Sequence, residues 1–345
     1  MPRALALLLI FAVLPIAAAE VLLRWFPVRT PRQVHFSPSS RSMRLDPDLI
    51  WRLQPGVSYE VETSEFREHR FTNSLGMRER EIAPRRPGER RLLALGDSFT
   101  YGAGVQASEA YPRIVEDLLR ARGDPTMVLN AGVPGYSFDQ SFRAAAEREQ
   151  QTDADVILAG ISCSDVEEGW LWPLYALRDG RLEALPAWKT GFYLQGLLTE
   201  NLPAWLARSA LFQQGLRRLP ARDFFFQRPG GSRESLRAWT RDKIALQLEA
   251  LQRSATESGH RIVALFMPCK EQLDPGAVPV YADMLTRAAA AGLPVVDGMA
   301  ALRSASPDVT RLFYTQDVHL NRDGHHALAV AVAGMLAEGG IAGGA

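Results

Sequence analysis

Three side chains in this sequence have the types that nucleophilic acyl transfer requires: a serine, a histidine and an aspartate. Ser98 stands in the sequence GDSFTYG, directly after the apolar run at residues 92–95. Asp317 and His319 stand near the other end of the chain, in the sequence TQDVHLN. A serine hydroxyl is a weak nucleophile until a base removes its proton, and a histidine oriented by an aspartate is such a base. We therefore predict that Ser98 is a nucleophile, His319 its base and Asp317 the partner of that base.

Attack on an ester carbonyl also requires donors for the negative charge that develops on the carbonyl oxygen. A fixed donor of this kind is commonly worth about 3 kcal/mol. Three candidates follow apolar runs of strand length: the N–H of Ser98, the N–H of Gly135 in NAGVPG and the hydroxyl of Ser164 in ISCSD. We predict that these three groups form an oxyanion hole.

The elements that must position these residues are short apolar runs that alternate with helical periodicity. The runs occupy residues 92–95, 127–129, 156–159, 262–267 and 294–296. Helical patterns occupy residues 111–123, 137–151, 243–260 and 321–340. Continuous apolar strands alternating with helices predict a parallel sheet with helices on both faces. Ligands of such sheets bind beyond the carboxyl ends of the strands, which is where Ser98, Gly135 and Ser164 fall.

An aromatic-rich segment at residues 166–240 interrupts the alternation and is too long for a simple connection. We predict an insertion or lid here. Trp170 and Trp172 follow the third run closely, so we predict that they face the substrate, with packing inside the insertion as the alternative. Lys270, after the fourth run, is a further candidate for substrate contact, with a solvated pair with Glu271 as the alternative.

Composition and charge argue against several classes of function. Lysine and arginine together number 39, aspartate and glutamate together also number 39, and the formal net charge is zero. Without a basic stripe, we predict no nucleic-acid partner. The sequence has no closely spaced cysteine pair, no histidine pair on one helix face near carboxylates and no glycine-rich phosphate loop. We therefore predict neither a metal ion nor another cofactor.

The N-terminus has the pattern of an export signal. A short basic stretch, Met1-Pro2-Arg3, precedes the apolar run at residues 4–19. If the apolar run extends to Leu23, it is long enough to span a membrane. We predict that residues 1–26 are a signal peptide or an N-terminal membrane anchor, and we favour the anchor; a buried helix of the domain is the alternative. In the first two cases the protein is extracytoplasmic, at the cell surface or in the periplasm.

The chain between this segment and the sheet divides into two parts. Residues 27–43 are polar and contain three prolines, so we predict a linker. Residues 44–90 form an extension in which the alternation at residues 57–61 predicts short antiparallel strands. The α/β domain is predicted at residues 91–340.

The sequences GDSFTYG, NAGVPG and DVHLNRDG resemble the blocks of the SGNH (GDSL-type) hydrolase superfamily, over roughly residues 91–336 without the insertion. The resemblance implies a flavodoxin-like three-layer α/β/α sandwich with a five-stranded parallel sheet in the order 2-1-3-4-5. It also implies ester hydrolysis without a metal, with Ser98 as nucleophile, Gly135 as donor and His319 as base. The lead-in NSLGMRERE resembles membrane-anchored, extracytoplasmic members, which often act on acylated envelope polysaccharides.

Two positions depart from the family pattern. The third block usually has an asparagine where this chain has Ser164, whose hydroxyl has one proton to donate. Many members have the aspartate three residues before the histidine, where this chain has Gln316. Asp317 stands two residues before His319, a spacing that some relatives share, and a backbone carbonyl is the alternative partner for the ring.

The strand order bears on the two cysteines. Cys163 follows the third run and Cys269 the fourth, and neighbouring strands lie about 4.8 Å apart. A disulfide between them is geometrically possible, and two free buried thiols are the alternative.

Three functions follow from these features. The first is a serine esterase or O-acyl (acetyl) transferase that acts on acylated small molecules or on envelope or extracellular glycans. The second is a glycan-binding or scaffolding protein with a decayed hydrolase fold, which the departures at Ser164 and Gln316 would favour. The third is a lipase or thioesterase with the aromatic segment as its lid.

Overall fold

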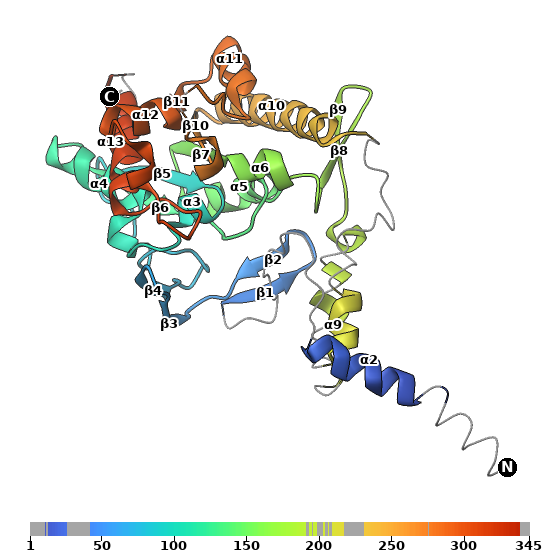
Figure 1. Cartoon of the computed structure of the whole chain (residues 1–345). Helices are drawn as coiled ribbons and strands as arrows, with labels where there is room; N and C mark the ends of the chain where they lie inside the picture. Colours follow the sequence, from blue (N-terminus) through green and yellow to red (C-terminus); the bar gives the residue numbers. More distant parts are fainter. Residues whose placement is uncertain are drawn as a thin grey trace. The chain divides into compact units, whose positions relative to one another are not determined.

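The computed structural model describes residues 11, 13–25, 42–190, 231–274 and 276–338, together with residues 193, 194, 196–198, 203, 206 and 209–216. The described chain divides into two compact units. The first comprises residues 1–51 and 186–227, and the second comprises residues 52–185 and 228–345. Each unit is described by itself below, with its elements labelled as in Figure 1. The predicted linker at residues 27–43 lies almost wholly outside the described residues.

A five-stranded parallel sheet forms the centre of the second unit. Its strands are β5 (Arg90–Leu95), β6 (Thr126–Asn130), β7 (Val156–Ser162), β10 (Arg261–Met267) and β11 (Val295–Asp297). Their spatial order is β11-β10-β7-β5-β6, and every pairing is parallel. Numbered along the chain this is the order 2-1-3-4-5, so the predicted topology is confirmed. The strands read as continuous apolar runs because both faces of the sheet are buried.

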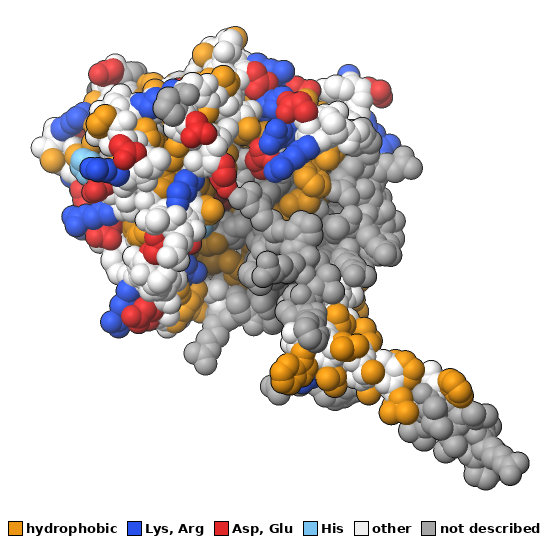
Figure 2. Space-filling model, in the orientation of Figure 1, with side chains coloured by type: hydrophobic (Ala, Val, Ile, Leu, Met, Phe, Trp, Pro, Cys, Tyr) orange, Lys and Arg blue, Asp and Glu red, His pale blue; other side chains and the backbone are white. Residues whose placement is uncertain are grey.

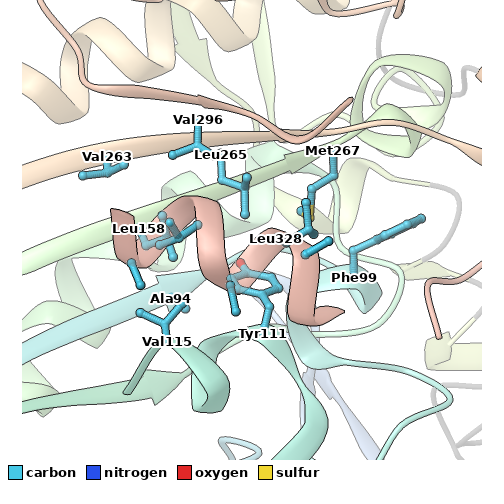
Figure 3. Packing of buried hydrophobic residues seen from close by; sticks show 14 of the residues in the cluster. Ala94, Phe99, Tyr111, Val115, Leu158, Val263, Leu265, Met267, Val296 and Leu328 are labelled. Carbon is cyan, nitrogen blue, oxygen red and sulfur yellow. The ribbon is translucent and has the colours of Figure 1, made fainter. Parts of the chain in front are cut away.

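Helices cover both faces of the sheet. One face carries α4 (Tyr111–Ala121), α12 (Gly298–Ala305) and α13 (Arg322–Glu338). The other carries α5 (Phe138–Thr152), α10 (Arg233–Glu257) and α11 (Ala282–Ala290). Successive strand side chains point to opposite faces, so Ala94 joins the first core, shown in Figure 3, and Leu93 joins the second. The three-layer α/β/α architecture predicted from the sequence is therefore confirmed.

Short one-turn and two-turn helices connect these elements. They are α3 (Ser98–Tyr101), η2 (Ala107–Glu109), α6 (Cys163–Glu168), η4 (Lys270–Gln272) and η5 (Val309–Leu312). Three of them, α3, α6 and η4, follow the carboxyl ends of β5, β7 and β10. This edge of the sheet therefore carries the candidate site residues.

The N-terminal extension contains the predicted antiparallel strands. β3 (Ser58–Glu62) pairs with β4 (Arg67–Phe71), and the turn between them spans residues 63–66. β1 (Met43–Asp46) pairs with β2 (Ile50–Leu53) in a separate two-stranded sheet. Arg78 anchors the chain that follows β4, because its buried guanidinium donates to Tyr101 O (3.0 Å), Gly102 O (2.6 Å) and Val105 O (2.7 Å).

The segment predicted as one insertion at residues 166–240 has a different organisation. The antiparallel hairpin of β8 (Tyr175–Arg178) and β9 (Arg181–Ala184) belongs to the second unit, as does α10, which already begins at Arg233. Residues 186–227 belong to the first unit, with η3 (Ala187–Lys189) and α9 (Ala210–Leu216). A buried ion pair joins α10 to α5, since Lys243 Nζ lies 2.7 Å from Asp139 Oδ2. The same Asp139 oxygen accepts the N–H of Leu174 (2.8 Å), which ties the residue before the hairpin to α5.

The first unit contains the apolar N-terminal helix. α2 (Leu14–Trp25) buries none of its residues, and Trp25 is 78% exposed. Hydrophobic side chains gather over α2 in Figure 2, whereas acidic and basic side chains are interspersed on the second unit. Glu20 accepts hydrogen bonds from the N–H groups of Ala210 (2.7 Å) and Leu211 (2.9 Å), so its carboxylate caps α9. Among the described residues, no helix has both the length and the apolar character that crossing a membrane requires.

Candidate active site

A tight turn brings Ser98 to the end of the first strand of the sheet. β5 ends at Leu95, and Ser98 is the first residue of α3. Gly96 occupies the turn at φ +155°, where a β-carbon would lie 2.9 Å from the Gly160 carbonyl oxygen. Asp97 caps α3, because its Oδ1 accepts the N–H of Phe99 at 2.9 Å. The Ser98 side chain is half-buried as a result.

His319 joins Ser98 to Asp317. Its Nε2 lies 2.8 Å from Ser98 Oγ, and its Nδ1 lies 2.6 Å from Asp317 Oδ1. The hydrogen bonds from the ring and the backbone N–H of His319 lower the pKa of Asp317, against an opposing effect of burial. An ionised carboxylate only accepts hydrogen bonds, so Nδ1 carries the proton and Nε2 is left to accept the proton of the serine hydroxyl. The structure thus brings the three predicted side chains together, although the serine and the histidine are 221 positions apart in the sequence.

The two-residue spacing of Asp317 and His319 has a local explanation. Asp317 Oδ1 also accepts the backbone N–H of His319, at 2.9 Å. One carboxylate oxygen therefore closes an Asx turn and holds the ring nitrogen of the same residue. Gln316 lies outside this turn, and its Oε1 lies 3.4 Å from Ser64 Oγ. The ring of His319 also packs against Phe99, with the centroids 5.3 Å apart.

The hydroxyl of Ser164 is already engaged within the protein. Ser164 Oγ lies 2.8 Å from Asp97 Oδ2 and 2.6 Å from Ser162 Oγ, and Ser162 Oγ lies 2.6 Å from the same Asp97 oxygen. Asp97 is therefore the acceptor of a small hydroxyl cluster, in addition to capping α3. A hydroxyl has one proton, so Ser164 must turn away from Asp97 before it can donate to an oxyanion.

Gly135 lies on the loop that follows β6. Val133 N–H donates to the carbonyl of Gly96 at 3.0 Å, which docks this loop on the turn that carries Ser98. Gly135 itself adopts φ +78°, a left-handed conformation that favours glycine. The loop thus presents the Gly135 backbone at the same sheet edge as Ser98.

The side chains predicted to contact substrate are placed differently from the prediction. Trp172 is only 2% exposed, and its Nε1 donates to Gln140 Oε1 at 3.1 Å, so it belongs to the packing around α5. This contradicts the prediction that Trp172 faces the substrate. Trp170 is half-buried, and its predicted role stays a prediction. Lys270 Nζ donates to Tyr314 O (2.6 Å) and to Thr315 O, so it is bound to the loop that leads to His319 rather than solvated beside Glu271.

Sequence reasoning missed Glu65, which lies in the turn between β3 and β4. Its carboxylate accepts the N–H groups of Thr315 (2.6 Å), Gln316 (2.8 Å) and Asp317 (2.8 Å). About 250 residues separate it from these partners in sequence. No local pattern in the sequence distinguishes this glutamate from its exposed neighbours.

A disulfide joins two of the strand ends. Cys163, the first residue of α6, is bonded to Cys269, which precedes η4, with 5.4 Å between their Cα atoms. The bond is possible because β7 and β10 are neighbours in the sheet. The structure thus contains the disulfide and not the alternative of two free thiols. Among the residues that the structure describes, no cluster of three His, Cys, Asp or Glu side chains is suited to hold a metal ion.

A comparison with protein families decides the relationship of this chain. The sequence model of the GDSL-like lipase/acylhydrolase family matches residues 94–327, which include all of the residues brought together above except Glu65. The chain belongs to the GDSL-like lipase/acylhydrolase family. It is therefore an ester-cleaving hydrolase, as the GDSFTYG and DVHLNRDG sequences predicted.

Several solved structures resemble this GDSL-like hydrolase. TesA is 13% identical, with a TM-score of 0.44 over 72% of this chain and 98% of its own. The esterase EstA from Pseudoalteromonas sp. is 12% identical, with a TM-score of 0.41 over 72% of this chain and 97% of its own. The acetyl xylan esterase AlAXEase is 15% identical, with a TM-score of 0.41 over 70% of this chain and 97% of its own. No curated protein matches the chain by sequence.

Proposed function

We propose that this hydrolase is a serine esterase or O-acyl transferase that works through an acyl-enzyme on Ser98. The observation that carries the proposal is the continuous contact from Ser98 Oγ through the His319 ring to Asp317, with distances of 2.8 Å and 2.6 Å. These are hydrogen-bond distances for a nucleophile, its base and the group that orients the base. Both contacts favour a catalytic site over a binding protein with a decayed hydrolase fold.

The proposed reaction begins when Ser98 Oγ attacks the ester carbonyl carbon while His319 Nε2 takes the hydroxyl proton. The N–H groups of Ser98 and Gly135 donate to the oxyanion, and Ser164 adds a third donor only if it leaves Asp97. Collapse of the tetrahedral intermediate expels the alcohol, which receives the proton from His319. Water or a sugar hydroxyl then attacks the acyl-enzyme by the same route in reverse, and its proton passes to His319.

The substrates that we propose are ester-linked acyl groups, above all acetyl groups, of envelope or extracellular glycans. The resemblance of NSLGMRERE to extracytoplasmic family members supports this class. The disulfide between Cys163 and Cys269 also supports an extracytoplasmic location, since disulfides persist in oxidising compartments. Preference for acetyl over long-chain esters of the same alcohol tests this class against a lipase or thioesterase.

For the N-terminal segment at residues 1–26 we propose retention at the membrane. The support is the exposed apolar surface of α2, on which Leu14, Leu22 and Trp25 are between 58% and 78% exposed. A helix that leaves such residues uncovered has a lipid surface as a suitable partner. Cell fractionation tests this proposal. The full chain is expected in the membrane fraction with its N-terminus intact. A soluble chain that lacks residues 1–26 would contradict retention and show that the segment is a cleaved signal peptide.

Hydrolysis of an aryl acetate by purified protein tests the catalytic proposal. Ser98→Ala and His319→Ala are each expected to lower kcat/KM by at least about 10³-fold while the far-ultraviolet circular dichroism spectrum is unchanged. Retention of the wild-type rate by Ser98→Ala would overturn the acyl-enzyme mechanism. Glycan binding by a wild-type protein that does not turn over any ester would instead favour the binding or scaffolding function.

A further inference from the structure

The loop that carries the Asp317 and His319 side chains has little regular structure of its own. Between η5 and α13, Phe313 and Leu320 form an isolated antiparallel bridge, and Tyr314 N–H donates to the His319 carbonyl at 3.1 Å. The backbone of residues 315–317 lies between these contacts. Contacts that hold this backbone in place therefore determine the position of the His319 imidazole relative to Ser98.

The Glu65 carboxylate holds this backbone by its N–H groups. Oε1 accepts from Thr315, while Oε2 accepts from both Gln316 and Asp317, so three consecutive N–H groups share one carboxylate. Hydrogen bonds to an ionised acceptor are shorter and stronger than those between neutral groups, and these lie between 2.6 and 2.8 Å. The third of these donors belongs to the residue that orients His319.

The turn that supplies Glu65 is itself held in shape. Thr63 N–H donates to the Phe66 carbonyl at 2.9 Å, and Thr63 Oγ1 accepts the N–H of Glu65 at 3.2 Å. The ring of Phe66 packs against Tyr314, with 5.1 Å between the centroids. The hairpin of β3 and β4 therefore presents the carboxylate from a defined turn and also contacts the residue at the start of the loop.

Lys270 holds the same loop by its backbone carbonyl groups. Its ammonium donates to the carbonyls of Tyr314 and Thr315. Thr315 is thus bound at its N–H by an anion and at its carbonyl by a cation, from two elements far apart in the sequence. Lys270 follows Cys269 directly, so the disulfide to Cys163 anchors the cationic side of this arrangement.

We infer that Glu65 is a positioning residue for the reaction of Ser98, acting through the backbone of residues 315–317, and that Lys270 acts on the same loop through the carbonyls of Tyr314 and Thr315. The inference rests on the proposed function of Ser98, His319 and Asp317. It makes the β3–β4 hairpin, which lies outside the family match at residues 94–327, a part of the catalytic apparatus. A small displacement of a catalytic group is enough to cost on the order of 10²-fold in rate, so the loss of these bonds should appear in kcat.

The test compares Glu65→Ala and Glu65→Gln with Glu62→Gln, an exposed carboxylate of the same hairpin, as the charge-matched control. For both Glu65 variants we expect kcat for an aryl acetate and the rate of labelling by a fluorophosphonate to fall by about 10- to 100-fold. KM should change less than about threefold, because neither substitution removes a contact that binds the ester in the ground state. The downfield proton resonance of the hydrogen bond between His319 and Asp317 should broaden or vanish in both variants and persist in Glu62→Gln.

The outcomes separate this inference from the proposed function. If Ser98→Ala is inactive and both Glu65 variants keep wild-type kcat and the downfield resonance, the positioning role is refuted while the mechanism stands. If Ser98→Ala remains active, the mechanism itself is refuted. Should Glu65→Ala fail to fold, Glu65→Gln decides, since it keeps the size of the side chain and loses one acceptor oxygen.

A double-mutant cycle with Lys270→Ala tests whether both residues act on the same backbone. If they do, the loss of kcat in the double variant is expected to be smaller than the product of the two single losses, because either loss already frees Thr315. Independent, multiplicative losses would show that Lys270 acts elsewhere.

Discussion

At the scale of single residues, the position of Asp317 two residues before His319 is explained by one oxygen atom. Asp317 Oδ1 accepts both the backbone N–H and the ring Nδ1 of His319. The three-residue spacing seen in many relatives is therefore not needed here, and Gln316 is left with an exposed polar contact to Ser64. The contacts with His319 thus lower the pKa of Asp317 and also close its turn.

Asp317→Asn is expected to lower kcat by on the order of 10³- to 10⁴-fold, because an amide in this place can hold the ring in the wrong tautomer. Steady-state hydrolysis of an aryl acetate measures this loss. Gln316→Ala is the matched control and should stay within about twofold of the wild type. Equal losses in both variants would show that the loop as a whole, and not the carboxylate, accounts for the effect.

The hydroxyl of Ser164 gives a second residue-scale prediction, since it donates its proton to Asp97 and lies within hydrogen-bond distance of the Ser162 hydroxyl. If it stays there during turnover, Ser164→Ala should lower kcat by less than about tenfold. Removal of a true oxyanion donor costs about 10²- to 10³-fold. A loss of that size would show that Ser164 rotates toward the substrate and belongs to the oxyanion hole, as the sequence predicted.

At the scale of elements, α13 and α4 meet through a buried histidine. His325 Nδ1 accepts the N–H of Tyr111, the first residue of α4, at 3.3 Å, and only 1% of His325 is exposed. Burial disfavours the charged ring and lowers the pKa of His325 from 6.5 to about 3. The neutral ring thus satisfies a helix N–H that otherwise lacks an acceptor in its own helix.

This burial makes the free energy of unfolding depend on pH in a definite direction. Below pH 6.5 the unfolded chain protonates His325 while the folded chain does not, so stability falls as the pH drops toward about 3. The slope is about 1.4 kcal/mol per pH unit where it is steepest. Above pH 6.5 this residue contributes no pH dependence.

Urea unfolding of His325→Gln at pH 7, 5.5 and 4.5 measures that contribution. A glutamine oxygen can still accept the Tyr111 N–H, so the variant should lose less stability than the wild type between pH 7 and pH 4.5. His326→Gln, at an exposed neighbouring position, should follow the wild type. Identical slopes for all three proteins would show that His325 is charged or exposed in the folded state.

At the scale of the whole molecule, the sheet could be predicted from the sequence because its signals are local. Each strand is a short continuous apolar run, and the order of the strands followed from the resemblance carried by GDSFTYG and its companion blocks. The meeting of Ser98 with His319 followed from the same source. Because both faces of the sheet are buried, each strand is a continuous apolar run that can be recognised in the sequence.

What could not be predicted depends on contacts between distant segments. Glu65 reaches the loop at residues 315–317 only after the hairpin has packed, and nothing in its own surroundings marks it. Trp172 follows the third strand closely, as a substrate-binding residue would, and this position led to the wrong prediction. Its ring is buried, and its Nε1 donates to Gln140. α10 begins at Arg233, ten residues before the predicted helix, and Ser232 caps it there by accepting the N–H of Ser235.

The disulfide is a long-range element of the whole fold, since 106 residues separate Cys163 from Cys269. Closing a loop of about 100 residues in the unfolded chain stabilises the native state by up to about 4.7 kcal/mol in the chain-entropy view. The Cys163→Ser/Cys269→Ser protein is therefore expected to unfold about 3–5 kcal/mol more easily in urea. The wild-type protein treated with a reductant should have the same free energy of unfolding as this variant. A variant as stable as the oxidised wild type would show that the disulfide does not stabilise the fold.

The central claim is that Ser98 is activated by His319 to form a covalent acyl-enzyme. The most direct measurement is mass mapping of the residue that a fluorophosphonate modifies in the folded protein. The account predicts one phosphonate adduct, on Ser98, and loss of that adduct in His319→Ala. A folded wild-type protein that takes no label, or takes it on another serine such as Ser164, would contradict the account.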